Sequence, residues 1–264
     1  MAERIEIDAA GDVRLNDFRD LTLADRRPDR PGGRGLVIAE GVPVVQRLLD
    51  SPYPIRAVMG VEAKISLLLP ELCMLDIPAY VVSASTMDSV VGFHLNRGVL
   101  ATADRGPVPD LNDLLGPSRR VAVLEGVNDH ENLGALFRNA AALGIDGIIL
   151  TERCADPLYR RSVRVSMGHV LRVSFVPNVA LPTALDALRA NGFQVAALTP
   201  QAPSIPLSRV DGSGRVAVLL GAEGPGLSAA ALTGADVRVR IPMPAGVDSL
   251  NIATAAAIAF YQLR

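Results

Sequence analysis

The chain has 264 residues, which is enough for one large domain or two modest ones, each able to bury a core. Apolar residues make up 49% and aromatic residues only 4%, without tryptophan, and this composition favours layered α/β structure over a β-sandwich. No apolar run reaches the ~18 residues that cross a bilayer, and the acidic start lacks the apolar core of a signal peptide. We therefore expect a cytoplasmic protein with no membrane partner.

The net charge of −2 taken alone argues against a nucleic-acid partner. The charge is unevenly distributed, however, because residues 1–117 carry 12 basic and 17 acidic side chains whereas residues 118–264 carry 14 and 11. Five arginines fall within residues 153–172. Since phosphate binding depends on the local patch and not on the total, the second half keeps a candidate phosphate-binding surface.

The N-terminal part is predicted to be an irregular arm followed by a small α/β domain. Residues 1–35 mix charges with proline and glycine, which indicates an arm without regular structure. A compact domain then spans residues 36–105, and the proline-rich residues 106–118 are predicted to be a linker. Its predicted strands are 36–41, 55–61, 79–83 and 97–105, and its predicted helices are 42–51 and 65–75.

Residues 119–264 alternate short apolar runs with helical segments, which is typical of a parallel sheet covered by helices on both faces. The predicted strands are 121–127, 147–151, 173–177, 194–199, 216–221 and 237–242. The predicted helices are 132–144, 182–192, 227–232 and 251–263, with a further short helix after the arginine-rich loop.

Two glycine- and proline-punctuated loops follow strands in this part, at residues 219–228 and 241–251. Loops at neighbouring strand ends can lie side by side and offer backbone groups to one small ligand. The glycines at 221, 224 and 226 do not have the spacing of the dinucleotide fingerprint and could simply form a tight turn. Glu223 between them favours a further role, since a carboxylate at a helix entrance can bind backbone N–H groups or a ligand.

Further polar residues accompany these loops, and each has a purely structural alternative. Asn132 starts a predicted helix, where it could be a cap, and Ser249 and Asn251 could cap the last helix. Arg138 lies within a run of Leu, Phe and Ala, so its guanidinium needs a partner, either a carboxylate or a phosphate ligand. The histidines and the cysteines Cys73 and Cys154 form no metal-binding pattern, and we expect no metal and no disulfide.

The segments ENLGALFRNAAALG, LLGAEGPGLS and IPMPAGVDSLNIATAAAIAFYQL, in this order, resemble the three motifs of the SpoU (TrmH-like) branch of the SPOUT RNA methyltransferases. The resemblance covers residues 119–264. The first ~105 residues, with the segments VIAEGVPVVQRLL and FHLNRGVLA, are similar to the small RNA-binding domain, ribosomal-protein-like in fold, that many members carry. One departure is mild: the last motif reads NIATAAA where NVSVAAA is commoner.

The resemblance implies a C-terminal domain with a trefoil knot that binds S-adenosyl-L-methionine, and a homodimer formed through that domain. By position, Gly221, Ile241 and Leu250 are expected to contact the cofactor through their backbone, with Thr199, Glu223 and Met243 nearby. Arg138 is expected to reach the site from one subunit while the other subunit supplies the cofactor pocket. The expected catalytic residues are Asn132, Arg138, Glu223, Ser249 and Asn251.

The implied reaction is methyl transfer to an RNA ribose 2′-hydroxyl, more in keeping with ribosomal RNA given the domain layout. Neutralising a guanidinium at pH 7 costs roughly 7 kcal/mol or more, so we interpret Arg138 as stabilising developing alkoxide charge and not as a base. Arg160, Arg161 and Arg164 are predicted to contact RNA.

Three alternatives stay open at this point. A tRNA ribose methyltransferase would share every motif. A non-catalytic knotted RNA-binding or assembly factor would keep the fold without the chemistry. A nucleotide-dependent oxidoreductase is disfavoured by the glycine spacing.

Overall fold

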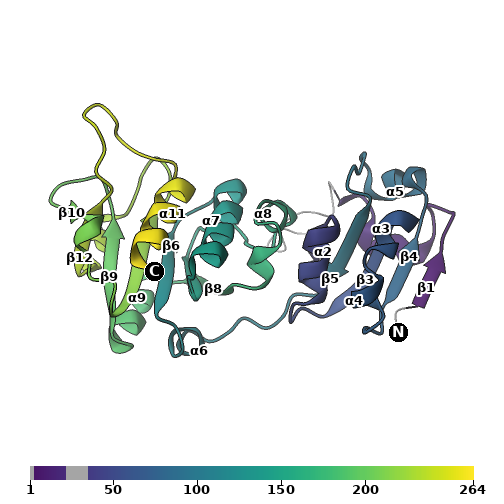
Figure 1. Ribbon diagram of the computed structural model, residues 1–264, viewed down its shortest axis with the longest axis horizontal. Coiled ribbons are helices and arrows are strands. Elements are labelled where there is room, and N and C mark those ends of the chain that lie inside the picture. Colours follow the sequence, from purple (N-terminus) through teal and green to yellow (C-terminus); the bar gives the residue numbers. More distant parts are fainter. Residues whose placement is uncertain (1–2, 22–34) are drawn as a thin grey trace. The chain divides into compact units, whose positions relative to one another are not determined.

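The computed structural model describes residues 3–21 and 35–264, which form two compact units (Figure 1). The first unit contains the described residues up to Pro107 together with Leu158–Arg172. The second contains Val108–Pro157 and Val173–Arg264. The segment 158–172 thus packs with the N-terminal residues, although in sequence it lies inside the predicted C-terminal domain. The glycine- and proline-rich residues 26–34 of the predicted arm lie outside the described residues.

The first unit is built on a mixed sheet, whose strand order within the described residues is β1-β4-β3-β5-β2. β1, β4 and β3 run parallel, while β5 is antiparallel to both β3 and β2. Its strands are β1 (Glu3–Glu6), β2 (Val37–Glu40), β3 (Ile55–Gly60), β4 (Pro78–Val81) and β5 (Val99–Ala103). Its helices are η1 (Val13–Phe18), α2 (Val42–Leu49), α3 (Glu62–Ser66), α4 (Leu69–Leu72), α5 (Ala84–Val91), α8 (Arg160–Val165) and η2 (His169–Leu171).

The prediction of an irregular arm is wrong for residues 3–18. β1 pairs with β4 at the sheet edge. The 3₁₀ helix η1 is capped by Asp12, whose side chain accepts a hydrogen bond from the Arg14 N–H. Leu15 and Phe18 are fully buried in the core of this unit. The charged residues that suggested an arm face solvent, whereas the few apolar ones anchor the segment.

The second unit contains a sheet that is parallel throughout, with the order β10-β12-β9-β11-β6-β7-β8 among the described strands. Its strands are β6 (Arg120–Glu125), β7 (Gly147–Thr151), β8 (Ser174–Val179), β9 (Phe193–Leu198), β10 (Ile205–Pro206), β11 (Arg215–Gly221) and β12 (Val237–Arg240). Its helices are α6 (Leu111–Leu115), α7 (His130–Leu143), α9 (Leu181–Ala190), η3 (Leu207–Arg209), α10 (Ala229–Gly234) and α11 (Ile252–Leu263). The predicted parallel α/β layering is confirmed, and the trefoil knot stays a prediction.

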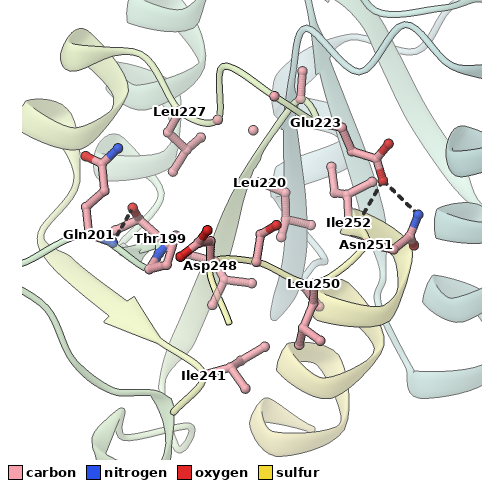
Figure 2. A pocket seen from close by; sticks show the side chains of 18 of the residues that line it. Thr199, Gln201, Leu220, Glu223, Leu227, Ile241, Asp248, Leu250, Asn251 and Ile252 are labelled. Atoms are coloured by element: carbon pink, nitrogen blue, oxygen red, sulfur yellow. Dashed lines mark hydrogen bonds between the residues drawn. The ribbon is translucent and has the colours of Figure 1, made fainter. Parts of the chain in front are cut away.

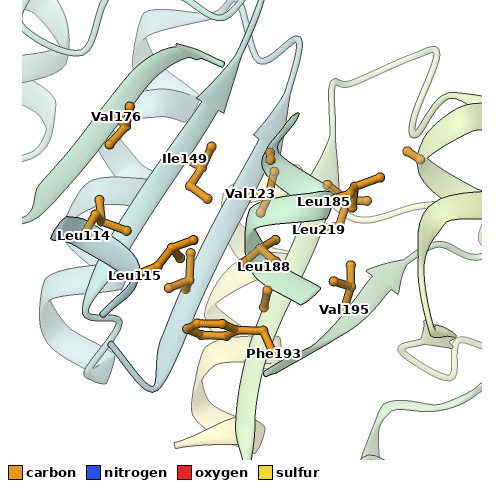
Figure 3. Close-up of a cluster of buried hydrophobic side chains, with 14 of the residues drawn as sticks. Leu114, Leu115, Val123, Ile149, Val176, Leu185, Leu188, Phe193, Val195 and Leu219 are labelled. Atoms are coloured by element: carbon orange, nitrogen blue, oxygen red, sulfur yellow. The ribbon is translucent and has the colours of Figure 1, made fainter. Parts of the chain in front are cut away.

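Alternate residues of each strand point to opposite faces of this sheet, and helices cover both faces. Val121 and Val123 of β6 pack with side chains of α6, α9 and α10 in the cluster drawn in Figure 3. On the other face α7 and α11 pack against each other (Figure 1). α7 buries Leu133, Leu136, Phe137 and Ala140 at helical spacing and ends, as predicted, at Gly144, whose φ of 74° suits glycine.

The predicted linker is wrong in its second half, where α6 is docked on the sheet. Leu114 and Leu115 of this helix are buried in the core of the second unit. Arg215 fixes the end of the helix, because its guanidinium donates to the carbonyl oxygens of Leu115, Gly116 and Ser118. Residues 108–118 therefore belong to the second unit.

Candidate cofactor and catalytic site

A cavity of about 680 Å³ lies at the carboxyl ends of β9 and β11, closed by the residues after β12 and the start of α11 (Figure 2). All six predicted cofactor residues line it, namely Thr199, Gly221, Glu223, Ile241, Met243 and Leu250. Three of the predicted catalytic residues line it, namely Glu223 again, Ser249 and Asn251. The two glycine- and proline-rich loops follow β11 and β12, which lie on either side of β9. They meet at one cavity because the carboxyl ends of parallel strands lie at the same edge of the sheet.

The loop after β11 folds back tightly on itself. Gly226 N–H donates to the Ala222 carbonyl, and a Cβ on Gly221 would lie 2.3 Å from the carbonyl carbon of Gly226. Gly224 and Gly226 adopt φ values of 86° and 69°. Glycine suits both the lack of space for a Cβ at Gly221 and the positive φ values at Gly224 and Gly226. The glycines therefore do form a tight turn, and this turn is also one wall of the cavity.

Glu125, at the end of β6, holds this loop through Ser228. No sequence pattern predicted this role. Its two carboxylate oxygens accept hydrogen bonds from the Ser228 N–H at 2.9 Å and the Ser228 hydroxyl at 2.6 Å. Ser228 in turn caps α10. The signal for Glu125 was its place at the end of a central strand, but its partner is 103 residues away in sequence.

Asn251 connects three of the predicted catalytic residues. Its side-chain N–H group donates to Asn132 Oδ1 at 2.8 Å and to Glu223 Oε1 at 2.7 Å (Figure 2 shows the second bond). Its Oδ1 accepts from the backbone N–H groups of Ala253 and Thr254, which makes it the cap of α11. The cap fixes the orientation of the amide, so Asn251 both starts the helix and holds Glu223.

Asn132 is not the cap of α7, which corrects the structural alternative considered for it. Asp129 caps that helix by accepting from the N–H groups of Glu131 and Asn132. The Asn132 side chain, one turn further in, is thereby free to accept the bond from Asn251.

Arg138 does not line the cavity of its own chain and is exposed on α7. The expectation of a guanidinium held within apolar surroundings is therefore wrong. Six residues separate it from Asn132, and at 3.6 residues per turn this places the two side chains on different faces of the helix. Among the described residues its guanidinium has no hydrogen-bond or ion-pair partner.

The three arginines predicted to contact RNA lie in α8, which packs in the first unit, and differ in environment. The Arg160 guanidinium lies 3.1 Å from Glu40 Oε2, and its carbon lies 5.0 Å from the centre of the Phe93 ring. Glu40 itself is buried. Arg161 and Arg164 are exposed. The guanidinium of Arg160 is thus bound within the first unit.

Two polar residues of the cavity were missed by the sequence analysis, Gln201 and Asp248. Gln201 follows β9 by three residues and Asp248 follows β12 by eight, and neither belongs to a polar pattern that marks it as functional. Cys154, in contrast, lies outside the cavity, and burial raises the pKa of its thiol, as expected of a small buried residue.

No cluster of three or more potential metal ligands occurs among residues 3–21 and 35–264. Likewise, within the part of the chain that the structure describes, no helix has the length and apolar character that crossing a membrane requires.

Comparison with known proteins adds to this geometry. Residues 119–261 match the model of the SpoU rRNA Methylase family. A Mycobacterium tuberculosis protein named as an uncharacterized tRNA/rRNA methyltransferase is 54% identical over 254 residues, covering 95% of this chain and 88% of that protein. The 23S rRNA (guanosine(2553)-2′-O)-methyltransferase RlmP of Bacillus subtilis is 27% identical and covers 98% and 99% of the two chains. The crystal structure of an AdoMet-bound rRNA methyltransferase from Sinorhizobium meliloti superposes with a TM-score of 0.83 at 25% identity, covering 99% and 97%.

Proposed function

Because the chain belongs to the SpoU rRNA methylase family, and is thus an RNA methyltransferase, we propose that it methylates a ribose 2′-hydroxyl of ribosomal RNA. The observation that carries this proposal is the convergence of all three motifs on one constellation. The first motif supplies Asn132, the second Glu223 and the third Asn251, and one amide group connects them.

The methyl donor is S-adenosylmethionine, and the cavity fits it. Its volume of about 680 Å³ lies within the 300–1,000 Å³ usual for cofactor sites. The walls combine apolar side chains, such as Leu220, Ile241 and Leu250, with the backbone of the glycine turn. Apolar walls suit an adenine ring, and backbone N–H and C=O groups suit its polar edge. When bound, the donor supplies a methyl group on a positively charged sulfur.

In this proposal the protein aligns the acceptor and stabilises charge. The guanidinium of Arg138 remains protonated, binds a phosphate of the RNA and stabilises the negative charge that develops on the ribose oxygen. Asn251 holds Glu223 at the cavity wall, and Ser249 and Asn132 border the path by which the ribose enters. The proton of the hydroxyl passes to water or to an RNA phosphate.

We further propose a homodimer in which Arg138 of one subunit serves the cavity of the other. Two observations support this arrangement: Arg138 lies outside its own cavity, and α11 exposes the large apolar side chains Ile258 and Tyr261. Within residues 255–259 of the same helix, Ala255 and Ala257 are small and partly exposed, which permits close approach of a second helix.

The ribosomal target rests on RlmP, a ribosomal-RNA enzyme that aligns with this chain from end to end. In the proposal the first unit selects the RNA, and Arg161 and Arg164 contact its phosphates.

The test is to incubate the protein with a donor labelled on its methyl group and with separated pools of ribosomal and transfer RNA. We expect the label in ribosomal RNA, in a dinucleotide that resists alkali because its ribose oxygen is methylated. Label confined to transfer RNA would show that transfer RNA is the substrate. Label on a base would overturn the ribose chemistry. Absence of label with intact donor binding would favour a non-catalytic factor.

A further inference from the structure

The charged side chains that line the cavity are all acidic. Among the described residues the lining includes Glu223 and Asp248 and contains no lysine, arginine or histidine. The cavity wall of one chain therefore presents negative charge to whatever it binds.

The two carboxylates differ in what they already bind. Glu223 Oε1 accepts hydrogen bonds from Asn251 Nδ2 at 2.7 Å and from the Ile252 N–H at 3.4 Å. The carboxylate of Asp248 makes no hydrogen bond or ion pair with any residue in the described part of the chain. Figure 2 shows Asp248 on the Thr199 side of the cavity, apart from the Glu223–Asn251 pair. Among the described lining residues, Asp248 is thus the acidic side chain that makes no bond within the protein, whereas Glu223 is already held at the start of α11.

We propose that Asp248 is the counter-charge for the positive charge of the methyl donor, an inference that rests on the proposed function. S-adenosylmethionine carries two cationic centres, the sulfonium and the α-ammonium of its methionine part. A carboxylate with no protein partner can accept a charge-assisted hydrogen bond from an ammonium or lie beside a sulfonium, and burial of the pair under the ligand strengthens either contact. The apolar walls then recognise the adenosine part, and Asp248 recognises the charged part.

This division of labour predicts a selective effect of removing the charge. Asp248→Asn keeps the size of the side chain and removes the negative charge. We expect about a tenfold loss in affinity for S-adenosylmethionine, the typical loss for one charge-assisted hydrogen bond. We expect no change for 5′-methylthioadenosine, which shares the adenosine part but carries neither cationic centre. The loss should shrink at high salt, because Asp248 is exposed in the free protein.

The experiment is calorimetric titration of the full-length protein and its variants with three ligands at low and high salt. The third ligand, S-adenosylhomocysteine, keeps the ammonium but lacks the sulfonium, so an equal loss assigns the contact to the ammonium and an unchanged affinity assigns it to the sulfonium. Asp248→Glu should recover most of the affinity for S-adenosylmethionine. Asp186→Asn is the matched control, since Asp186 is 78% exposed on α9 and does not line the cavity.

Equal losses for all three ligands would mean that Asp248 only shapes the loop, and unchanged affinities would mean that it faces solvent; either result overturns the inference. If the unmodified protein bound no S-adenosylmethionine, the proposed function itself would fail, and this outcome is distinct from both.

Discussion

Polar residues led to the prediction of two functional regions, the cavity of the second unit and the arginine-rich helix α8 of the first unit. The two regions differ in what the predicted side chains bind. At the cavity, the predicted residue Asn251 is hydrogen-bonded to the predicted residues Asn132 and Glu223, and Asn251 and Glu223 line the cavity. In α8, the predicted cation Arg160 is bound by the buried carboxylate of Glu40. A site that is built from backbone turns at strand ends can be predicted from the order of the segments along the chain. Whether an arginine is available to bind RNA depends on partners that lie far away in the sequence.

The largest effect is expected at the turn that forms the cavity wall. Gly221→Ala places a Cβ 2.3 Å from the backbone of Gly226, so the turn must open. We expect the affinity for S-adenosylmethionine to fall by about a hundredfold or more, since the wall of the cavity moves. Gly214→Ala is the control, because its Cβ would meet no atom within 4 Å. Calorimetry reads both, and equal affinity in the two variants would contradict the role of the turn.

Arg138 tests whether the cavity is complete within one chain. Arg138→Ala should reduce turnover by about a thousandfold, with little effect on stability because the side chain is exposed. Mixing this variant with a Glu223→Ala variant should restore about a quarter of the activity. Half of the randomly mixed dimers are heterodimers, and each has one intact site of two.

No recovery in the mixture, with dimers present, would place both residues in the same chain. Arg138→Lys separates the chemical roles. Near-full turnover with an acidic shift of the pH profile would favour a base over charge stabilisation.

Asn251 tests whether capping and positioning are separable. Asn251→Ser keeps a good helix cap but is too short to hold Glu223, whereas Asn251→Ala removes both functions. We expect both variants to lose turnover by about a hundredfold, and only the alanine variant to lose stability, by ~1 kcal/mol. Thermal unfolding and methyl-transfer rates measure the two effects. A fully active serine variant would reduce Asn251 to a cap.

Substitutions of the α8 arginines should have the smallest effects on the methyl-transfer step, and they sharpen the comparison. Arg160→Ala leaves the buried Glu40 carboxylate without its nearest cation and should destabilise the first unit by ~1–3 kcal/mol. Arg164→Ala should leave stability unchanged. Arg161→Ala and Arg164→Ala should each reduce the salt dependence of RNA binding by about one unit of slope. Unchanged slopes would leave these two residues as solvated surface charges.

The central strands of the second unit could be predicted because apolar runs between helices indicate a parallel sheet. The predicted residues of its cavity came from the resemblance of three segments to the SpoU motifs. The partner of Asn132 could not be predicted, since it depends on Asp129 taking the cap and on Asn251 arriving from 119 residues away. β1 was missed because a strand of four residues at a sheet edge carries little apolar pattern. The docking of α6 was missed because the prolines and glycines on either side of this short helix resemble a linker, although Leu114 and Leu115 are buried in the core.

The most direct measurement is a crystal structure of the protein with S-adenosylmethionine. We expect the ligand in the cavity between β9, β11 and α11, with its adenosine against Gly221, Ile241 and Leu250 and its charged end toward Asp248. A ligand bound elsewhere, or a cavity that stays empty at saturating concentration, would show that this cavity is not the cofactor site.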